Sequence, residues 1–242
     1  MQVGDQEIID RGVIYSNLDN LISGEKRVSD LRRIGKIQHK VFGLQPNASY
    51  SIKAYVKTES GEFLSDAFTF KTEAIPQEPF SLGDKGPGGG IVFFDGGDYS
   101  KGYRYMEARS LEAAFYDNFV WSPLEFRLIG TSRNFGTGET NTDIYLQKIL
   151  NTNPLNAFYS ASVFEENGYR DWFIPSVEEL KVVFENLSRE QILQEFKRIN
   201  SDRFLSSSEV DRERVYLVNA ENQAESISFK GIGHNVIVVR VF

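Results

Sequence analysis

The sequence contains no cysteine and only two histidines in 242 residues. Without cysteine the chain cannot form disulfides, thiolate metal sites or cysteine nucleophiles. Because His39 and His234 lie far apart in the sequence, a multi-histidine metal site is not expected, and a Ser-His-Asp triad would have to recruit one of these two residues. These two shortages argue against many classes of metalloenzyme and hydrolase.

The chain also lacks a basic excess and a long apolar run. Its net charge is −7, and no Lys/Arg cluster is dense enough to attract a phosphate backbone, so nucleic acid is not an expected partner. No apolar run is long enough to span a membrane, and residues 1–6 lack the basic and apolar regions of a signal peptide. We therefore expect no membrane insertion of this chain, and a signal or lipid anchor for export is absent from it.

The chain is predicted to form two domains, residues 1–74 and 81–242, joined by a linker at 75–80. The linker prediction rests on Pro76 and Pro79, which lie close together in a stretch without apolar periodicity. Before the linker, short runs rich in β-branched and aromatic residues are separated by Gly, Pro, Asn and Asp, and they occupy residues 12–16, 36–42, 50–56 and 68–72. This spacing predicts an all-β sandwich.

Residues 43–72 of the first domain resemble a fibronectin type III domain. The resemblance rests on Gly43-Leu-Gln-Pro-Asn-Ala-Ser-Tyr50 and on the closing Phe68-Thr-Phe-Lys-Thr72. It implies that Leu44 packs in the core, that Tyr50 begins a strand, and that Phe70 and Thr72 close the sandwich. Residues 11–16 resemble the variant of this module in bacterial surface proteins, but too few residues precede them for a full first strand. A spacer is the favoured role and an adhesive module the alternative.

The second domain carries two helix-start signals of the same kind. Ser176 and Glu179 form a predicted capping box before an apolar pattern of helical spacing, and Ser188 with Gln191 forms another. Two further helices are predicted, one capped by Thr140 or Asn141 and one over residues 156–166. Strands are predicted around them, at 91–94, 103–107, 204–209, 214–218, 226–229 and 236–242. Helices flanked by hairpins predict an α+β domain.

Two loops of this domain invite a ligand interpretation. The glycines of Gly86-Pro-Gly-Gly-Gly90 precede a strand, whereas a phosphate cradle needs them between a strand and a helix, so a tight turn is favoured. Asp95 and Asp98 flank two glycines and could bind calcium together with loop carbonyls. The loop lacks the regularly spaced acidic ligands of an EF-hand, and a hairpin turn is therefore the favoured interpretation.

Six motifs of residues 80–242 occur in the order found in one bacterial family. They are residues 86–95 (GPGGGIVFFD), 103–108 (YRYMEA), 136–142 (GTGETNT), 168–176 (GYRDWFIPS), 205–209 (LSSSE) and 239–242 (VRVF). Together they resemble the C-terminal domain of a collagen-like adhesin, which implies a C-type lectin-like fold. That fold is also similar to formylglycine-generating enzymes, whose copper-binding cysteines are absent here, so this activity is not expected.

The predicted function is non-catalytic binding or adhesion by a bacterial cell-surface or secreted protein. A glycan or protein ligand would contact loops of the C-terminal domain. The candidate ligand-binding residues are Trp121, Arg133, Asn134, Thr137, Glu139, Asn141 and Asp143. The loop's hydroxyls and amides could equally satisfy buried backbone groups. Trp172 is expected in the core, and calcium at Asp95 and Asp98 is the only cofactor left open. The alternatives are an enzyme of the same fold acting on an extracellular substrate and a structural component of a surface assembly.

Overall fold

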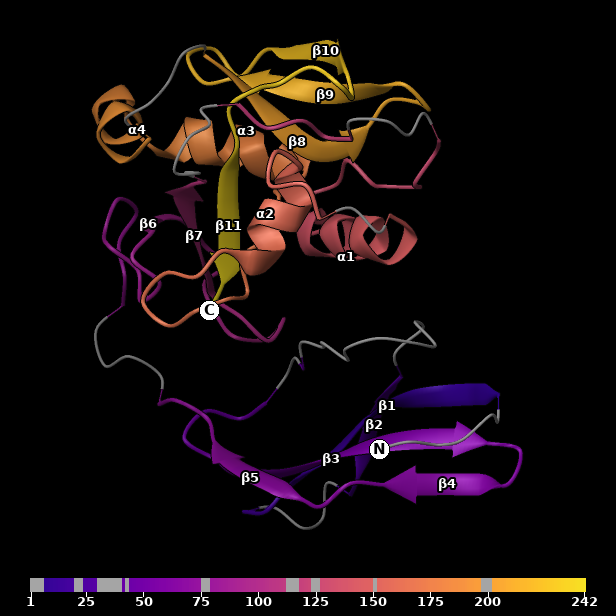
Figure 1. The fold of residues 1–242 in the computed structure, drawn as a ribbon. Helices are drawn as coiled ribbons and strands as arrows, with labels where there is room; N and C mark the ends of the chain where they lie inside the picture. The colour runs from indigo at the N-terminus through magenta and orange to yellow at the C-terminus, as the bar shows by residue number, and fades with distance from the viewer. Residues whose placement is uncertain are drawn as a thin grey trace. The chain divides into compact units, whose positions relative to one another are not determined.

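A computed structural model describes residues 7–19, 24–29, 41, 44–74, 79–111, 118–122, 127–149, 152–196 and 202–242. The chain divides into two compact units (Figure 1). Unit 1 comprises Met1–Pro79 with Ser100–Gly102, and unit 2 comprises Phe80–Tyr99 with Tyr103–Phe242. The described residues form antiparallel sheets in both units, and their four helices all lie in unit 2, so the architecture is mixed and mostly β.

Unit 1 contains one five-stranded sheet. Its strands are β1 (Ile8–Asn17), β2 (Lys26–Ser29), β3 (Ser49–Thr58), β4 (Gly61–Leu64) and β5 (Phe68–Lys71). The order is β2-β1-β3-β4, and β5 pairs with the first half of β3. Of the strand predicted at 36–42, only Val41 lies within the described residues.

The apolar cluster of unit 1 contains the residues that carry the fibronectin-like resemblance. Tyr50 is buried, and Leu44 and Phe70 are partly buried against the same cluster. The Tyr50 hydroxyl accepts a hydrogen bond from the backbone N–H of Gln45 (2.8 Å), which ties the turn before β3 to the strand. The Thr72 hydroxyl donates to the Gln45 carbonyl (2.6 Å) from the other side of the turn.

Unit 2 contains two three-stranded sheets. The first sheet has the order β11 (Ile237–Val241), β7 (Tyr105–Ser110) and β6 (Ile91–Asp95). The second sheet has the order β10 (Glu225–Phe229), β9 (Arg214–Asn219) and β8 (Arg203–Glu209). The helices are α1 (Gly138–Lys148), α2 (Ala157–Val163), α3 (Val177–Asn186) and α4 (Arg189–Glu195). Helix α3 contacts β6 of one sheet and β8 and β9 of the other, so it joins the two sheets (Figure 1).

Both predicted capping boxes are confirmed. The Ser176 hydroxyl accepts from the N–H of Glu179, and the Glu179 carboxylate accepts from the N–H of Ser176 at the start of α3. Ser188 and Gln191 repeat this exchange at the start of α4. The apolar face of α3 is buried through Leu180, Val183 and Phe184, as its spacing predicted.

The predicted bounds of the other two helices need correction. Helix α1 begins at Gly138 after the N-cap Thr137, so Thr140 and Asn141 lie inside its first turns and do not cap it. Thr137 makes no side-chain capping bond to the helix, which explains why the cap was not recognisable in the sequence. Helix α2 ends at Val163, because Phe164 is in extended conformation. Asn156 caps its start by accepting a hydrogen bond from the N–H of Tyr159 (2.9 Å).

Within the described ranges, no helix is long and apolar enough to cross a membrane.

Candidate functional site

A buried ionic network connects four of the six sequence motifs. Glu107 is completely buried, and its two carboxylate oxygens accept the backbone N–H groups of Gly88 (2.9 Å) and Gly90 (2.8 Å). Arg240 donates to the same carboxylate at 2.7 Å and to both oxygens of Asp171 at 2.9 and 3.2 Å. The glycine-rich turn therefore does bind an anion, but the anion is a side chain of the same unit.

The packing around this network explains why its residue types are so restricted. The Arg240 guanidinium lies 4.0 Å from the centre of the Tyr169 ring, a cation–π contact. A Cβ atom on Gly88 would come within 2.8 Å of both Glu107 and Trp172. Burial by itself would lower the pKa of Arg240, but Asp171 and Glu107 outweigh it and the pKa is raised. Trp172 is buried, which confirms its predicted core position.

The remaining two motifs meet around Glu179 and the serines of β8. Besides capping α3, the Glu179 carboxylate accepts the N–H of Gly136 (3.1 Å). Burial raises the pKa of Glu179 despite the hydrogen bonds donated by Ser176, Gly138 and Gly136. The Ser208 hydroxyl accepts the N–H of Val177 (3.0 Å), so β8 is fastened to the start of α3.

A third buried carboxylate is that of Glu209, at the end of β8. Its carboxylate accepts the backbone N–H groups of Ile129 and Thr131 at 3.0 and 3.1 Å, and also that of Gly130. The buried Lys230 ammonium lies 2.8 Å from it. Burial by itself would raise the pKa of Glu209, but Lys230 and the three N–H groups outweigh it and the pKa is lowered. A carboxylate held in this way is a structural anion and not a proton donor at neutral pH.

The predicted ligand loop, residues 133–143, is partly occupied by the scaffold. Asn141 is buried, and its side-chain amide exchanges hydrogen bonds with the backbone of Ser132 (2.7 Å each) and donates to Ser207. The Thr137 hydroxyl donates to the carbonyl of Asn134 (2.6 Å). In the structure, the polar groups of these two predicted ligand residues hold the loop in shape.

The other predicted loop residues lie nearer the surface. Arg133 pairs with Glu178 (3.3 Å) and Glu225 (2.7 Å), and its guanidinium stacks 4.5 Å from the centre of the Tyr216 ring. The side chains of Asn134 and Asp143 are exposed and that of Glu139 is partly exposed. The structure brings these residues onto one loop and helix start.

Trp121 does not offer a surface for a sugar, which corrects that expectation. Its side chain has no exposed area, and its ring packs edge-on against Tyr145 and Phe158, with centroids 5.1 and 5.0 Å away. The Lys230 ammonium lies 4.3 Å from the ring centre. The ring is thus part of the core beneath the Glu209 site.

Asp95 is held by hydrogen bonds within its own hairpin. Asp95 accepts two hydrogen bonds from the Arg104 guanidinium (2.7 and 2.8 Å) and one from the N–H of Gly97 (2.8 Å). Arg104 holds the pKa of Asp95 below its ordinary value. Among the residues that the structure describes, no group of three or more potential metal-ligating His, Asp or Glu side chains comes together. The favoured hairpin interpretation agrees with the antiparallel pairing of β6 and β7.

Of the two histidines, only His234 lies within the described residues, whereas His39 lies outside them. His234 is half-buried, and its Nε2 lies 2.7 Å from the Ser228 hydroxyl. Burial, with a smaller effect of Arg203, lowers the pKa of His234, so the ring is neutral at neutral pH.

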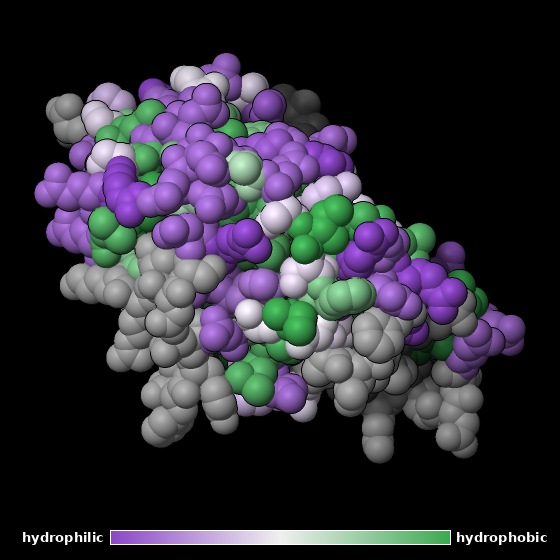
Figure 2. Space-filling view, turned by 90° about the horizontal axis from the view of Figure 1, so that it is seen from above, coloured by the Kyte–Doolittle hydropathy of each residue, from purple (hydrophilic) through white to green (hydrophobic). Residues whose placement is uncertain are grey.

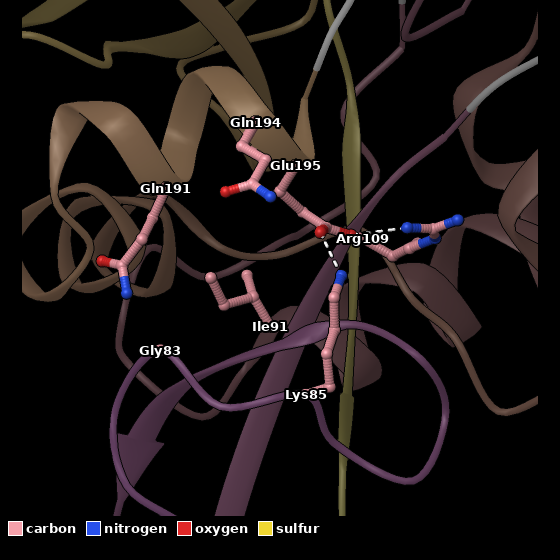
Figure 3. A pocket seen from close by; sticks show the side chains of 7 residues that line it. All are labelled: Gly83, Lys85, Ile91, Arg109, Gln191, Gln194 and Glu195. Carbon is pink, nitrogen blue, oxygen red and sulfur yellow. Dashed lines mark hydrogen bonds and ion pairs between the residues drawn. The ribbon is translucent and has the colours of Figure 1, made fainter.

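One pocket of unit 2 contains hydrogen-bonding groups that the scaffold does not use. It has a volume of about 590 Å³ and is lined by Gly83, Lys85, Ile91, Arg109, Gln191, Gln194 and Glu195. In Figure 3, Lys85 from the loop before β6 and Arg109 from β7 converge on Glu195 at the end of α4. The Glu195 side chain is 6% exposed, while that of Lys85 is 60% exposed.

The contacts of this pocket set its charge balance. Arg109 donates to Glu195 at 2.6 Å and to Glu166 at 3.3 Å, and Lys85 pairs with Glu195 and lies 3.4 Å from the carbonyl of Gly89. The two cations are thus balanced by two carboxylates. None of the lining residues was among the sequence-predicted ligand residues, because Arg109 and Glu195 are 86 positions apart and Lys85 and Glu195 are 110 apart.

No family model matches the chain, and no curated protein matches it. The pocket and the buried networks are therefore the observations from which its function is inferred.

Proposed function

We propose that the chain is a non-catalytic binding protein of the bacterial cell surface or its surroundings. In this proposal unit 2 recognises a glycan or protein ligand, and unit 1 serves as a spacer. The observation that carries the proposal is the pocket between Lys85, Arg109 and α4, where polar side chains line a cavity of about 590 Å³. The volume of this pocket lies within the range that is typical of small-molecule ligand sites.

The state of the acidic side chains favours binding over catalysis. Glycoside hydrolysis needs two carboxylates that face one bond. Glu195 is the only carboxylate among the described residues that line the pocket, and two cations hold it. The buried Glu107 and Glu209 are saturated by backbone N–H groups and a cation each. These groups stabilise loops and leave no described acid–base pair at the pocket.

The surface also favours recognition by polar groups. The face drawn in Figure 2 has hydrophobic residues interspersed among hydrophilic ones. Interfaces of permanent assemblies usually expose a broad contiguous apolar patch in the isolated subunit. On the face that Figure 2 draws, the dispersed pattern agrees with a protein that binds its ligand reversibly.

The test is a binding screen of the full chain on glycan and protein arrays, with calcium and with a chelator. We expect a specific ligand whose binding is weakened by the double variant Lys85→Ala/Gln194→Ala. The matched control is Gln147→Ala, which truncates an exposed glutamine of α1 away from the pocket. Hydrolysis of a polymer substrate without retained binding, or an array with no ligand, would contradict the proposal.

A further inference from the structure

We infer that the Lys85–Arg109–Glu195 pocket binds a neutral saccharide through hydrogen bonds, an inference that rests on the proposed binding function. The first argument is that the pocket contains hydrogen-bond donors and acceptors that no described residue uses. The Gln194 amide has one acceptor and two donor positions, and within the described chain it makes no hydrogen bond. Gln191 uses its Oε1 for the α4 cap and turns its NH₂ toward Gly83. The pocket therefore presents donors and acceptors side by side (Figure 3).

A glycine makes this arrangement possible. Gly83 has a φ of +94°, and a Cβ atom there would lie 2.1 Å from the Gln191 side-chain nitrogen. Because Gly83 lacks that atom, the Gln191 amide can occupy the wall of the pocket while its oxygen caps α4. A side chain at position 83 would displace the amide and narrow the cavity.

Mixed donors and acceptors suit a hydroxyl group, which both donates and accepts. An anion only accepts, so it could not bond to Glu195 or to the Gln194 oxygen. It would also compete with Glu195, whose side chain is 6% exposed, for the positive charge of Lys85 and Arg109, and a buried carboxylate that loses charge compensation is costly. A cation would meet Lys85 and Arg109. The charge balance of the pocket therefore selects a neutral ligand with several hydroxyl groups.

The cavity also fits the size and faces of a sugar. Its volume of about 590 Å³ accommodates a mono- or disaccharide. The Ile91 side chain belongs to the lining and offers an apolar contact for the C–H groups of a sugar ring. None of the lining residues is aromatic, so recognition would depend on hydrogen bonds instead of ring stacking.

The experiment uses the full chain and a panel of neutral methyl glycosides of glucose, galactose, mannose and N-acetylglucosamine. Glucuronate and N-acetylneuraminate form the anionic arm of the panel. Saturation-transfer NMR detects binding and calorimetry gives the Kd. We expect at least one neutral glycoside to bind, with a Kd that is unchanged between about 50 and 500 mM salt because no charge is neutralised.

Variants locate the site. Gln194→Ala removes an exposed side chain of α4 and should weaken binding about threefold to tenfold, the value of one neutral hydrogen bond. Gln147→Ala, which truncates an exposed glutamine on α1, should leave the Kd unchanged, and circular dichroism checks that both variants are folded. An unchanged Kd in folded Gln194→Ala would overturn the inference.

Two further outcomes separate this inference from the proposed function. Binding confined to the anionic sugars, and lost with salt, would overturn the neutral-saccharide inference while the binding function stands. The same holds if no sugar binds but the arrays identify a protein ligand. Failure of both the sugars and the arrays would contradict the inference and the binding function together.

Discussion

Replacing Arg240 by alanine should destabilise unit 2 more than any surface substitution. Among the described residues, Arg240 is the only cation that contacts the completely buried Glu107, and it bridges that carboxylate to Asp171. After the substitution Glu107 keeps the N–H groups of Gly88 and Gly90 but loses its counter-ion. Asp171 is 28% exposed and can be rehydrated, so most of the cost arises at Glu107.

The expected loss follows from known buried ion pairs. Removing one partner of such a pair typically costs about 3–5 kcal/mol, because the remaining charge stays buried without compensation. Loss of the cation–π contact with Tyr169 adds to this cost, on the order of 0.5–2 kcal/mol. A loss of about 4 kcal/mol is a large part of the roughly 5–15 kcal/mol that stabilises a domain.

Tryptophan fluorescence during urea unfolding measures this loss in unit 2 alone. Both tryptophans of the chain, Trp121 and Trp172, lie in unit 2, so excitation near 295 nm reports only its unfolding. With a denaturant slope of about 2 kcal/mol/M, the midpoint should fall by about 2 M. Because Trp172 contacts Arg240, the native emission of Arg240→Ala should also change.

The matched control is Arg104→Ala. Arg104 also makes a two-bond pair with an aspartate, Asp95, but both side chains are near the surface, 27% and 31% exposed. Exposed pairs contribute little because water and salt screen them. Equal midpoint shifts in the two variants would refute the assignment of Glu107 and Arg240 as the main ionic support of this loop.

Three further predictions use the same assay. Ser176→Ala should lower the free energy of unfolding by about 1 kcal/mol, because it removes the buried cap of α3. Ser188→Ala removes the exposed cap of α4 and should lower it by less. A larger loss of stability in Ser188→Ala would contradict this order. Folding lowers the pKa of Glu209, so its ionised carboxylate stabilises unit 2. This stabilisation should be fully present at pH values above the ordinary carboxyl pKa, and it should disappear as the pH falls through the lowered pKa of the folded state. The fall in stability on acidification should therefore be smaller in Glu209→Gln, and an identical pH profile would be evidence against the charged state. Gly88→Ala should destabilise unit 2 more than Gly97→Ala. A Cβ atom at position 88 would lie 2.7 Å from Glu107, whereas one at position 97 would meet no atom within 4 Å and would carry only the strain of a positive φ. A larger destabilisation by Gly97→Ala would contradict this argument.

The sequence patterns predicted correctly those features that depend on residues close together in the chain. The capping boxes at Ser176 and Ser188 need partners only three positions away, and the apolar spacing of α3 depends on one helix alone. The start of α1 was misplaced because Thr137 caps it without a side-chain bond, so the sequence offered two polar residues inside the helix as equally plausible caps.

The sequence could not show which residues of the predicted ligand loop belong to the scaffold, for a related reason. Polar residues such as Asn141 and Thr137 were chosen because their side chains suit a ligand, but the same groups suit unsatisfied loop backbone, and the structure uses them there. Trp121 was chosen for an irregular sequence environment, yet it is covered by Tyr145 and Phe158 from helices that follow it in the chain. Exposure depends on such distant contacts.

By itself, the sequence determined the starts of α3 and α4, most strands, the core position of Trp172 and the absence of cysteine chemistry, because these depend on composition or on residues a few positions apart. Only the tertiary structure decided which charges are buried together. Glu107 and Arg240 are 133 positions apart, and Lys85 and Glu195 are 110 apart. The first pair stabilises the glycine-rich turn and the second lines an open pocket. No local pattern separates these two outcomes, because burial and charge balance arise only when distant strands and helices pack together.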